Sequence, residues 1–318
     1  MKHNIITTLI LLGMFLITQL IGLFIINAYL PYTQPIVNIT TGITENITIS
    51  PEIPFGMNPP EVTPEFSLGS FMISFAFAVL LIFLLIKIKK PIFLRIWFFI
   101  VVVIALGISI NSFIMKIEYG KYIALSLAIL LAYFKIFKRD IILHNITELF
   151  VYPGIAVIFV FLLDIPVTIF LLLVISVYDI YAVWYAGFMQ KMAKYQMNEV
   201  KVFGGFFIPY IHPKDRARVR ELKLMKKQGK KVKKSNIKVE LGILGGGDVI
   251  FPLILAGVLL KVMGLIPALI ITLFSTASLL TLFIIARKGK FYPAMPFLTI
   301  GCLLGLLAVQ ILKFISIL

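Results

Sequence analysis

Long apolar runs separated by short polar stretches extend along the whole chain. A helix needs about 20 mostly apolar residues to cross the hydrocarbon core of a bilayer, and most of the runs are close to that length. The predicted spans are residues 5–30, 68–87, 92–114, 120–137, 148–163, 166–189, 242–262, 264–286 and 296–317. The pattern therefore predicts an all-α, polytopic membrane protein with nine transmembrane helices.

The ends of two predicted spans decide how the helices are counted. The fifth and sixth spans are separated only by Asp164, Ile165 and Pro166, and the proline favours a tight break over one long helix.

The first span has a longer apolar run than a secretory signal peptide, and no clear small-residue cleavage site follows it. We therefore expect the first span to remain as a membrane helix.

The composition agrees with a membrane protein. Of 318 residues, 60% are hydrophobic and 14% are charged, whereas soluble domains are about 45–50% apolar and about 25% charged. The net charge of +16 would suggest a nucleic-acid partner for a soluble protein. Here the Lys and Arg residues lie mostly in gaps between apolar runs, where they set membrane topology. We therefore expect no nucleic-acid partner.

Positive charge is distributed unevenly among the gaps. The second, fourth, sixth and eighth gaps are rich in Lys and Arg, whereas the first has none and the third and seventh have few. Basic loops remain on the cytoplasmic side of a membrane. We therefore expect a multi-pass protein of the cell membrane with a cytoplasmic N-terminus and an extracytoplasmic C-terminus.

Two long gaps divide the chain into three parts. Residues 1–189 form a six-helix part that includes a proline-rich outer loop at 31–67, residues 190–241 form a basic cytoplasmic loop, and residues 242–318 form a three-helix part. The basic loop is typical of a solvated segment that fixes topology, and such clusters also attract anionic lipid headgroups. We expect the lipid bilayer as a partner, with anionic headgroups at residues 190–241.

The sequence offers little for metal or nucleophilic chemistry. Cys302 is the only cysteine, which excludes an internal disulfide and a Cys-based zinc site. The histidines His3, His144 and His212 are far apart and have no metal-ligand spacing. We expect no metal site and no cofactor, and Ser-His catalysis is disfavoured.

Acidic residues within apolar spans are the informative exception. A carboxylate at the centre of a membrane helix costs about 2.5–3.5 kcal/mol on translocon scales. Asp179 and Asp248 lie roughly 15 Å and roughly 9 Å from the inner ends of the sixth and seventh spans, at about 1.5 Å per residue. These spans are consecutive and antiparallel, so the two acids could face each other. Asp164 is instead interpreted as an interfacial or helix-capping acid ahead of Pro166.

A facing pair of carboxylates has a defined chemistry. Because both cannot readily ionise, the pair shares one proton. The charged member can act as a general base on a water, while the protonated member polarises a carbonyl. Three glycines before Asp248 weaken its helix, and non-helical backbone at that depth must be buried or line a water-filled cavity. Ion and proton pathways also use paired intramembrane acids, and the acids alone favour neither interpretation.

Three motifs in three different spans resemble those of one family. Tyr178-Asp179 in the sixth span, Gly245-Gly246-Gly247-Asp248 in the seventh and Pro293-Ala294-Met295-Pro296 at the start of the ninth resemble the YD, GxGD and PAL signatures of the presenilin and signal peptide peptidase family. The nine spans and the inside N-terminus are similar to presenilins. Met295 stands where the family has Leu, a residue of similar volume. The resemblance covers most of the chain, whose length is similar to that of an archaeal-type presenilin homologue.

The resemblance implies a presenilin-like fold and an intramembrane aspartyl endopeptidase, which hydrolyses peptide bonds within transmembrane helices or signal peptides. Asp179 and Asp248 would be the catalytic pair. The residues that shape the site would be Tyr178, Gly245, Gly247, Pro293, Ala294 and Met295. The loop at 190–241 would admit the substrate or form a strand with it. The substrate must unwind locally, because a helix hides its peptide bonds in hydrogen bonds.

Three alternatives remain open on the sequence. A polytopic transporter or ion channel with paired intramembrane acids would have the spans but not the three motifs. A prepilin-type peptidase also uses GxGD, but there a lysine soon follows the Asp, whereas Val249, Ile250 and Phe251 follow here. A catalytically silent membrane scaffold is the third.

Overall fold

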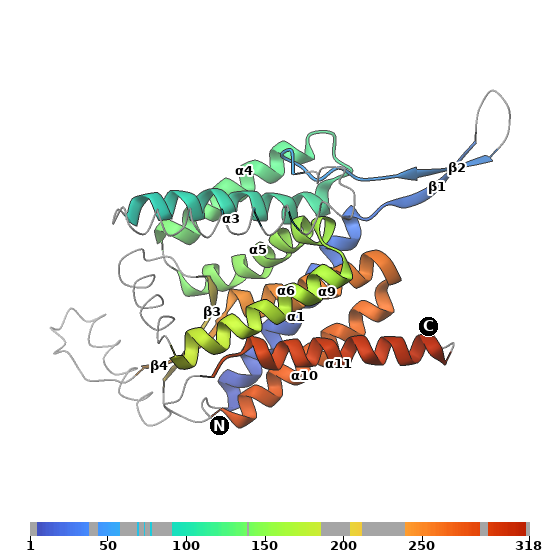
Figure 1. The fold of residues 1–318 in the computed structure, drawn as a ribbon. Coiled ribbons are helices and arrows are strands. Elements are labelled where there is room, and N and C mark those ends of the chain that lie inside the picture. Colours follow the sequence, from blue (N-terminus) through green and yellow to red (C-terminus); the bar gives the residue numbers. More distant parts are fainter. Residues whose placement is uncertain are drawn as a thin grey trace.

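A computed structural model describes residues 5–37, 44–57, 91–138, 140–185, 204–211, 239–286 and 292–315, together with the single residues 69, 73 and 77. Most of these residues are helical and pack as a bundle (Figure 1). The α-helices are α1 (Ile5–Tyr29), α3 (Pro91–Ile114), α4 (Gly120–Tyr133), α5 (Ile141–Leu162), α6 (Ile165–Ile180), α9 (Gly246–Met263), α10 (Leu265–Ile285) and α11 (Met295–Phe314). Two π-helical turns, η1 (Phe134–Lys138) and η2 (Tyr181–Tyr185), continue α4 and α6. The strands are β1 (Tyr32–Val37), β2 (Thr44–Ile49), β3 (Gly205–Ile211) and β4 (Val239–Gly245).

Eight helices in the described part of the chain are long and apolar enough to cross a membrane. They correspond to eight of the predicted spans, and the prediction of a helical membrane bundle is confirmed. The predicted span at 68–87 lies outside the described residues, apart from Gly69, Ile73 and Phe77, which are helical.

Two tight connections join consecutive helices. α5 ends at Leu162 and α6 begins at Ile165, with Pro166 in its first turn, so the predicted break is confirmed. Between α9 and α10 the chain turns at Gly264, whose φ is +89°. Glycine adopts this left-handed conformation without steric cost, and the turn sends α10 back along α9.

The predicted start of the fifth span at residue 148 is wrong, because α5 already begins at Ile141. Asp140 occupies the N-cap position, and its carboxylate accepts hydrogen bonds from the backbone N–H groups of Ile142 and Leu143. Such a cap satisfies donors that a helix start otherwise leaves without partners. The polar residues His144, Asn145, Thr147 and Glu148 follow the apolar first turn and interrupt the hydrophobic run, so the run of apolar residues placed the start of the span too late.

The predicted start of the seventh span at residue 242 is also wrong. Residues 239–245 form β4, which pairs antiparallel with β3 so that Gly205 lies opposite Gly245. The backbone of Gly245 is extended, with φ −66° and ψ 145°, and α9 begins at the next residue. Strand pairing satisfies backbone groups that would otherwise require a helix. A strand therefore leads directly into the helix that carries Asp248.

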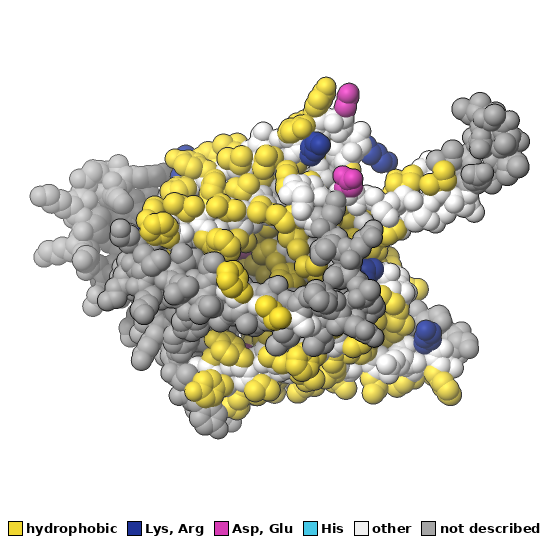
Figure 2. Space-filling model, turned by 45° about the horizontal axis from the view of Figure 1, so that its top comes forward, with side chains coloured by type: hydrophobic (Ala, Val, Ile, Leu, Met, Phe, Trp, Pro, Cys, Tyr) yellow, Lys and Arg dark blue, Asp and Glu magenta, His cyan; other side chains and the backbone are white. Residues whose placement is uncertain are grey.

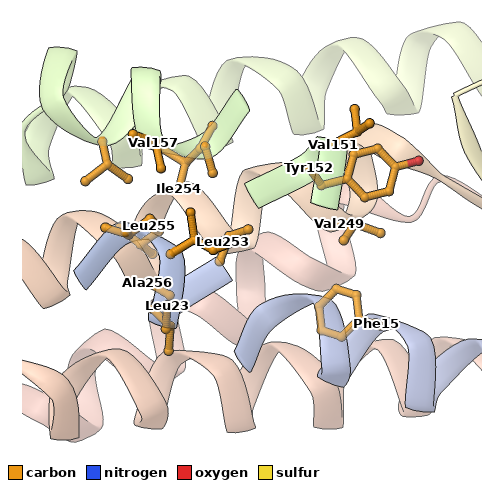
Figure 3. Packing of buried hydrophobic residues seen from close by; sticks show 14 of the residues in the cluster. Phe15, Leu23, Val151, Tyr152, Val157, Val249, Leu253, Ile254, Leu255 and Ala256 are labelled. Carbon is orange, nitrogen blue, oxygen red and sulfur yellow. The ribbon is translucent and has the colours of Figure 1, made fainter. Parts of the chain in front are cut away.

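Helix α9 lies at the centre of the bundle. It packs against α1, α5, α6, α10 and α11. Its buried residues include the consecutive side chains of Leu253, Ile254 and Leu255, which point in different directions around the helix. In Figure 3 these residues lie between Val157 of α5 and Leu23 of α1. A helix that is apolar on all sides is typical of a bundle centre.

The outer surface of the helices is apolar. Figure 2 shows hydrophobic side chains over most of the described part of one face, with few charged side chains among them. Phe24, Phe113, Ile266 and Leu273 are among the large hydrophobic residues that are exposed. Extended apolar surfaces mark sites of membrane or protein contact, which agrees with helices that face lipid.

The two hairpins lie at opposite ends of the bundle. β1 pairs with β2 and projects beyond the helices, whereas β3 and β4 lie near the other end (Figure 1). Helix α1 begins toward the β3–β4 end and helix α11 ends toward the β1–β2 end (Figure 1). The two long predicted gaps therefore contribute strands to opposite ends of the bundle, as their predicted topology requires.

We expect Gly154→Ala to destabilise the bundle. A Cβ at Gly154 of α5 would lie 2.6 Å from the carbonyl carbon of Ala105 in α3, so the two helix backbones would have to separate. Overpacking of this kind typically costs about 1–3 kcal/mol. Thermal unfolding in detergent measures the loss. The control is Gly13→Ala in α1, where no atom lies within 4 Å. Equal melting temperatures for the two variants would contradict the prediction.

Candidate active site

Asp179 lies in the last turn of α6 and is only 7% exposed. Its Oδ2 atom accepts a hydrogen bond of 3.0 Å from the backbone N–H of Met295, and the backbone N–H of Ala294 also hydrogen-bonds the carboxyl. Met295 is the first residue of α11, where N–H groups have no partner within the helix. The partial positive charge of a helix N-terminus stabilises a carboxylate. The start of α11 therefore solvates Asp179.

The predicted PAL-like motif is thus in contact with Asp179. Pro293 is buried, Ala294 precedes the helix, and Pro296 lies in its first turn. The two prolines have no N–H to donate and restrict the backbone on either side of the donors. The structure brings these predicted site residues together with Asp179.

A second polar contact joins α6 to α11 about one helical turn from Asp179. The hydroxyls of Ser176 and Thr299 lie 2.6 Å apart and are both buried. Sequence reasoning missed this pair. The signal that could have found it is spacing, because Ser176 precedes Asp179 by three residues and Thr299 follows Met295 by four, which places each on the same helix face as its neighbour.

Asp248 lies in the first turn of α9, immediately after β4. The backbone N–H of Gly245 hydrogen-bonds its carboxyl, and the carboxyl interacts electrostatically with Asp179. A Cβ at Gly245 would lie 3.0 Å from Oδ2 of Asp248. The two predicted acids are therefore neighbours, and Gly245 leaves room for the second of them.

Of the next two glycines, Gly246 has the tighter surroundings. A Cβ at Gly246 would lie 2.9–3.2 Å from ring and hydroxyl atoms of Tyr152, whereas a Cβ at Gly247 would meet only Phe251 at 3.5 Å. The sequence singled out Gly245 and Gly247 but not Gly246. Gly246 is confined by the ring of Tyr152, which belongs to α5. Because Tyr152 is far from the glycine motif in the sequence, the motif itself does not indicate this contact.

Gln19 is a further residue that sequence reasoning missed. It is buried in α1, and its Nε2 donates a hydrogen bond of 2.9 Å to the carbonyl of Val249. Val249 follows Asp248, so the contact ties the first turn of α9 to α1. A glutamine inside an apolar run was the available signal, since buried polar groups need partners.

Tyr178 does not lie in the packed interior beside Asp179. Its side chain is 57% exposed in the structure. Successive residues of a helix point about 100° apart, so a buried Asp179 turns its neighbour outward. Tyr178 therefore does not pack in the core beside Asp179.

Asp164 is separate from the acid pair. It precedes α6 at the end opposite to Asp179, its side chain makes no capping hydrogen bond, and Lys261 lies 3.9 Å from it. The Lys261 ammonium also donates to the carbonyls of Val160 and Leu163 at the end of α5. Asp164 thus occupies the N-cap position of α6, but its side chain does not cap the helix, and its interpretation as an interfacial acid stays a prediction. Among the described residues no three His, Cys, Asp or Glu side chains gather closely enough to hold a metal ion.

Comparison with solved structures identifies the fold. Two structures described as a presenilin family intramembrane aspartate protease, in C222 and P2 space groups, align with TM-scores of 0.57 and 18% sequence identity. The alignments cover 96% and 95% of this chain and 99% and 96% of those chains. No family model matches the sequence, and the comparison with curated proteins also finds no match. The presenilin-like fold expected from the motifs is confirmed by the structural comparison.

We expect Gly246→Ala to lower stability more than Gly247→Ala. The new methyl group at 246 would press on the fully buried Tyr152 ring, whereas the methyl group at 247 would make an ordinary contact with Phe251. Overpacking against an immobile ring costs about 1–3 kcal/mol. Melting temperatures in detergent compare the two variants directly. A larger loss at 247 would show that Tyr152 does not confine the start of α9.

Proposed function

We propose that the protein is an intramembrane aspartyl endopeptidase that hydrolyses peptide bonds within transmembrane helices or signal peptides. One observation carries the proposal: two carboxyls on different membrane helices interact with each other, in a fold similar to that of known intramembrane aspartate proteases. Asp179 and Asp248 would be the catalytic pair and would act on a water. The function needs no cofactor and no metal.

The chemistry follows from one proton shared by two carboxyls. The charged carboxylate would take a proton from water while the water oxygen attacks the carbonyl carbon of the substrate. The protonated carboxyl would give its proton to the carbonyl oxygen, which forms a tetrahedral diol. In the second step the carboxyl that had taken a proton from water would give it to the amide nitrogen, and the C–N bond would break. The other carboxyl, now charged, would take a proton from the diol. The carboxyls end in their starting state.

The β3–β4 hairpin supports a role in holding the substrate as a strand. Asn145 of α5 pairs with both backbone groups of Phe207, donating to its carbonyl at 2.8 Å and accepting from its N–H at 3.0 Å. Phe207 therefore turns its backbone groups away from β4. In an antiparallel pair the opposite residue, Ile243, must then turn its own backbone groups away from β3.

The neighbouring pairs follow the same alternation. The N–H of Gly246 donates to the carbonyl of Gly204 at 3.2 Å, as expected for the alternate, hydrogen-bonded position. In the described part of the chain this sheet has two strands. The outer edge of β3 is covered by Asn145, so the edge of β4 would receive an extended substrate segment. Strand addition at such an edge supplies main-chain hydrogen bonds.

The remaining assignments belong to the same proposal. Tyr178, Gly245, Gly247, Pro293, Ala294 and Met295 would shape the site. The chain would lie in the cell membrane with its N-terminus, the loop 190–241 and the acid pair toward the cytoplasm. Anionic headgroups would contact that basic loop.

We expect Asp179→Asn and Asp248→Asn each to abolish cleavage of a fluorescent transmembrane peptide by the purified protein in detergent. Each change removes one of the two ionisable groups and should lower kcat by at least about 10²-fold. Asp164→Asn is the matched control, because it changes an acid at the opposite end of α6, and it should cleave normally. Retained cleavage in either single variant would remove that residue from the pair. Ion or solute flux without peptide fragments would favour a transporter.

We expect Ile243→Pro to weaken cleavage more than Ile243→Ala. Both variants lose the side chain, but only proline loses the N–H that faces the outer edge of β4. The lost hydrogen bond to substrate should reduce kcat/KM roughly threefold to tenfold. Melting temperatures should stay similar, since this N–H does not bond β3. Equal kcat/KM values for the two variants would contradict strand addition at this edge.

A further inference from the structure

Two buried hydroxyls, Ser176 on α6 and Thr299 on α11, join these helices near the candidate active site. Their oxygens lie 2.6 Å apart, and Oγ1 of Thr299 also lies 3.4 Å from the carbonyl oxygen of Leu172 on α6. A hydroxyl has one proton to donate, so both contacts are made when Ser176 donates to Thr299 and Thr299 donates to Leu172. Thr299 is therefore tied to α6 at two points that are one helical turn apart.

Helix α10 holds the same part of α11 from another side. The hydroxyl of Ser278 on α10 donates a hydrogen bond to the carbonyl of Phe297 in the first turn of α11. One turn later, a Cβ at Gly301 would lie 2.9 Å from the carbonyl oxygen of Phe274, so the two helices are close there. Contacts with α6 and α10 together fix where α11 begins.

The position of α11 decides which donors Asp179 receives. The backbone N–H of Met295, the first residue of α11, donates to Oδ2 of Asp179 at 3.0 Å, and the N–H of Ala294 also bonds this carboxyl. Backbone N–H groups move with their helix, and a hydrogen bond weakens when it lengthens or bends. The Ser176–Thr299 bridge lies one turn from Asp179 on α6 and one turn from Met295 on α11. It therefore controls the distance between these donors and the carboxyl.

The backbone donors make the two acids unequal. Hydrogen bonds to the charged form of a carboxyl favour that form. Asp179 receives two backbone N–H groups, whereas Asp248 receives one, from Gly245. In a pair that shares one proton, the negative charge is therefore expected on Asp179 and the proton on Asp248.

We infer that the Ser176–Thr299 bridge positions the start of α11 on Asp179 and thereby makes Asp179 the base of the proposed reaction. The inference rests on the proposed function. Asp179 takes a proton from water while the water oxygen attacks the carbonyl carbon, and Asp248 gives its proton to the carbonyl oxygen. Ser176 and Thr299 are positioning residues, because they act on Asp179 through α11.

The charged residues of the elements that pack against α6 leave this assignment to the backbone donors. These elements are α9, α11 and η2. Their charged residues are Asp248 in the first turn of α9, and Lys261 and Lys313 in the last turns of α9 and α11. Both lysines lie at the helix ends away from Asp179. The other titratable residues of these elements and of α6 are Tyr178, Tyr181, Tyr185 and Cys302.

Thr299→Val tests the inference, because it keeps the side-chain shape and removes both hydroxyl contacts. We expect kcat for the transmembrane peptide to fall roughly tenfold, since small displacements at a reacting group are costly, with KM changed less than about twofold. The charged form of Asp179 loses support, so the acidic limb of the pH–rate profile should move to higher pH while the basic limb stays. Ser176→Ala, which removes one of the two contacts, should move the same limb by less. Thr299→Ser, which keeps the hydroxyl, should restore most of the rate.

Thr168→Val is the matched control. Thr168 also lies on α6 and is only 1% exposed, but its hydroxyl donates to the carbonyl of Asp164 at 2.8 Å, at the end of the helix away from Asp179. This variant should lose a similar amount of melting temperature while keeping kcat and both limbs of the profile.

Two results for Thr299→Val would overturn the inference and leave the proposed function intact. One is a pH–rate profile in which neither limb moves. The other is movement of the basic limb alone, which would place the negative charge on Asp248. Absence of cleavage by the wild-type protein would instead overturn the proposed function.

Discussion

Carboxylates buried among apolar helices are the constraint on which this structure depends. A charged carboxyl is costly inside a membrane, by about 2.5–3.5 kcal/mol at the centre of a helix, unless the protein supplies partners. Asp179 receives backbone N–H groups from Ala294 and Met295, and Asp248 receives that of Gly245. All three donors lie at helix starts, where N–H groups have no partner inside the helix. Breaks in regular structure therefore make the buried acids tolerable.

The same requirement explains the polar contacts that surround the acids. Gln19 ties the first turn of α9 to α1, and the hydroxyls of Ser176 and Thr299 tie α6 to α11. Lys135 and Glu148 neutralise each other on η1 and α5. Each of these groups is paired across two elements, so removing one partner would leave the other without compensation. The helices near the site are thus joined by polar contacts in addition to apolar packing.

The junction between β4 and α9 joins the strand that is proposed to bind the substrate to the helix that carries Asp248. Gly245 ends the strand and donates to Asp248, and the next residue begins the helix that carries this acid. A substrate segment paired with β4 would therefore be extended beside the acid pair. Because a helical peptide bond is shielded by its own hydrogen bonds, binding as a strand would also expose the bond to be cut.

The sequence by itself predicted the approximate position of most spans and located two acids within them. Hydropathy is a property of consecutive residues, and an acid in an apolar run is visible without any structure. The break before Pro166 was predictable for the same reason, since proline acts on its own backbone. The ordered motifs around Tyr178, Asp248 and Pro293 also indicated the fold that the comparison with solved structures identified.

Only the tertiary structure decided how the site is built. Residues 239–245 form a strand because β3 supplies its partners, and α5 begins at Ile141 because Asp140 caps it. Asp179 and Met295 are 116 residues apart, and Tyr152 reaches Gly246 from another helix. Hydrogen bonds and steric contacts between distant segments leave no periodic signal in either segment, so they became visible only when the helices packed.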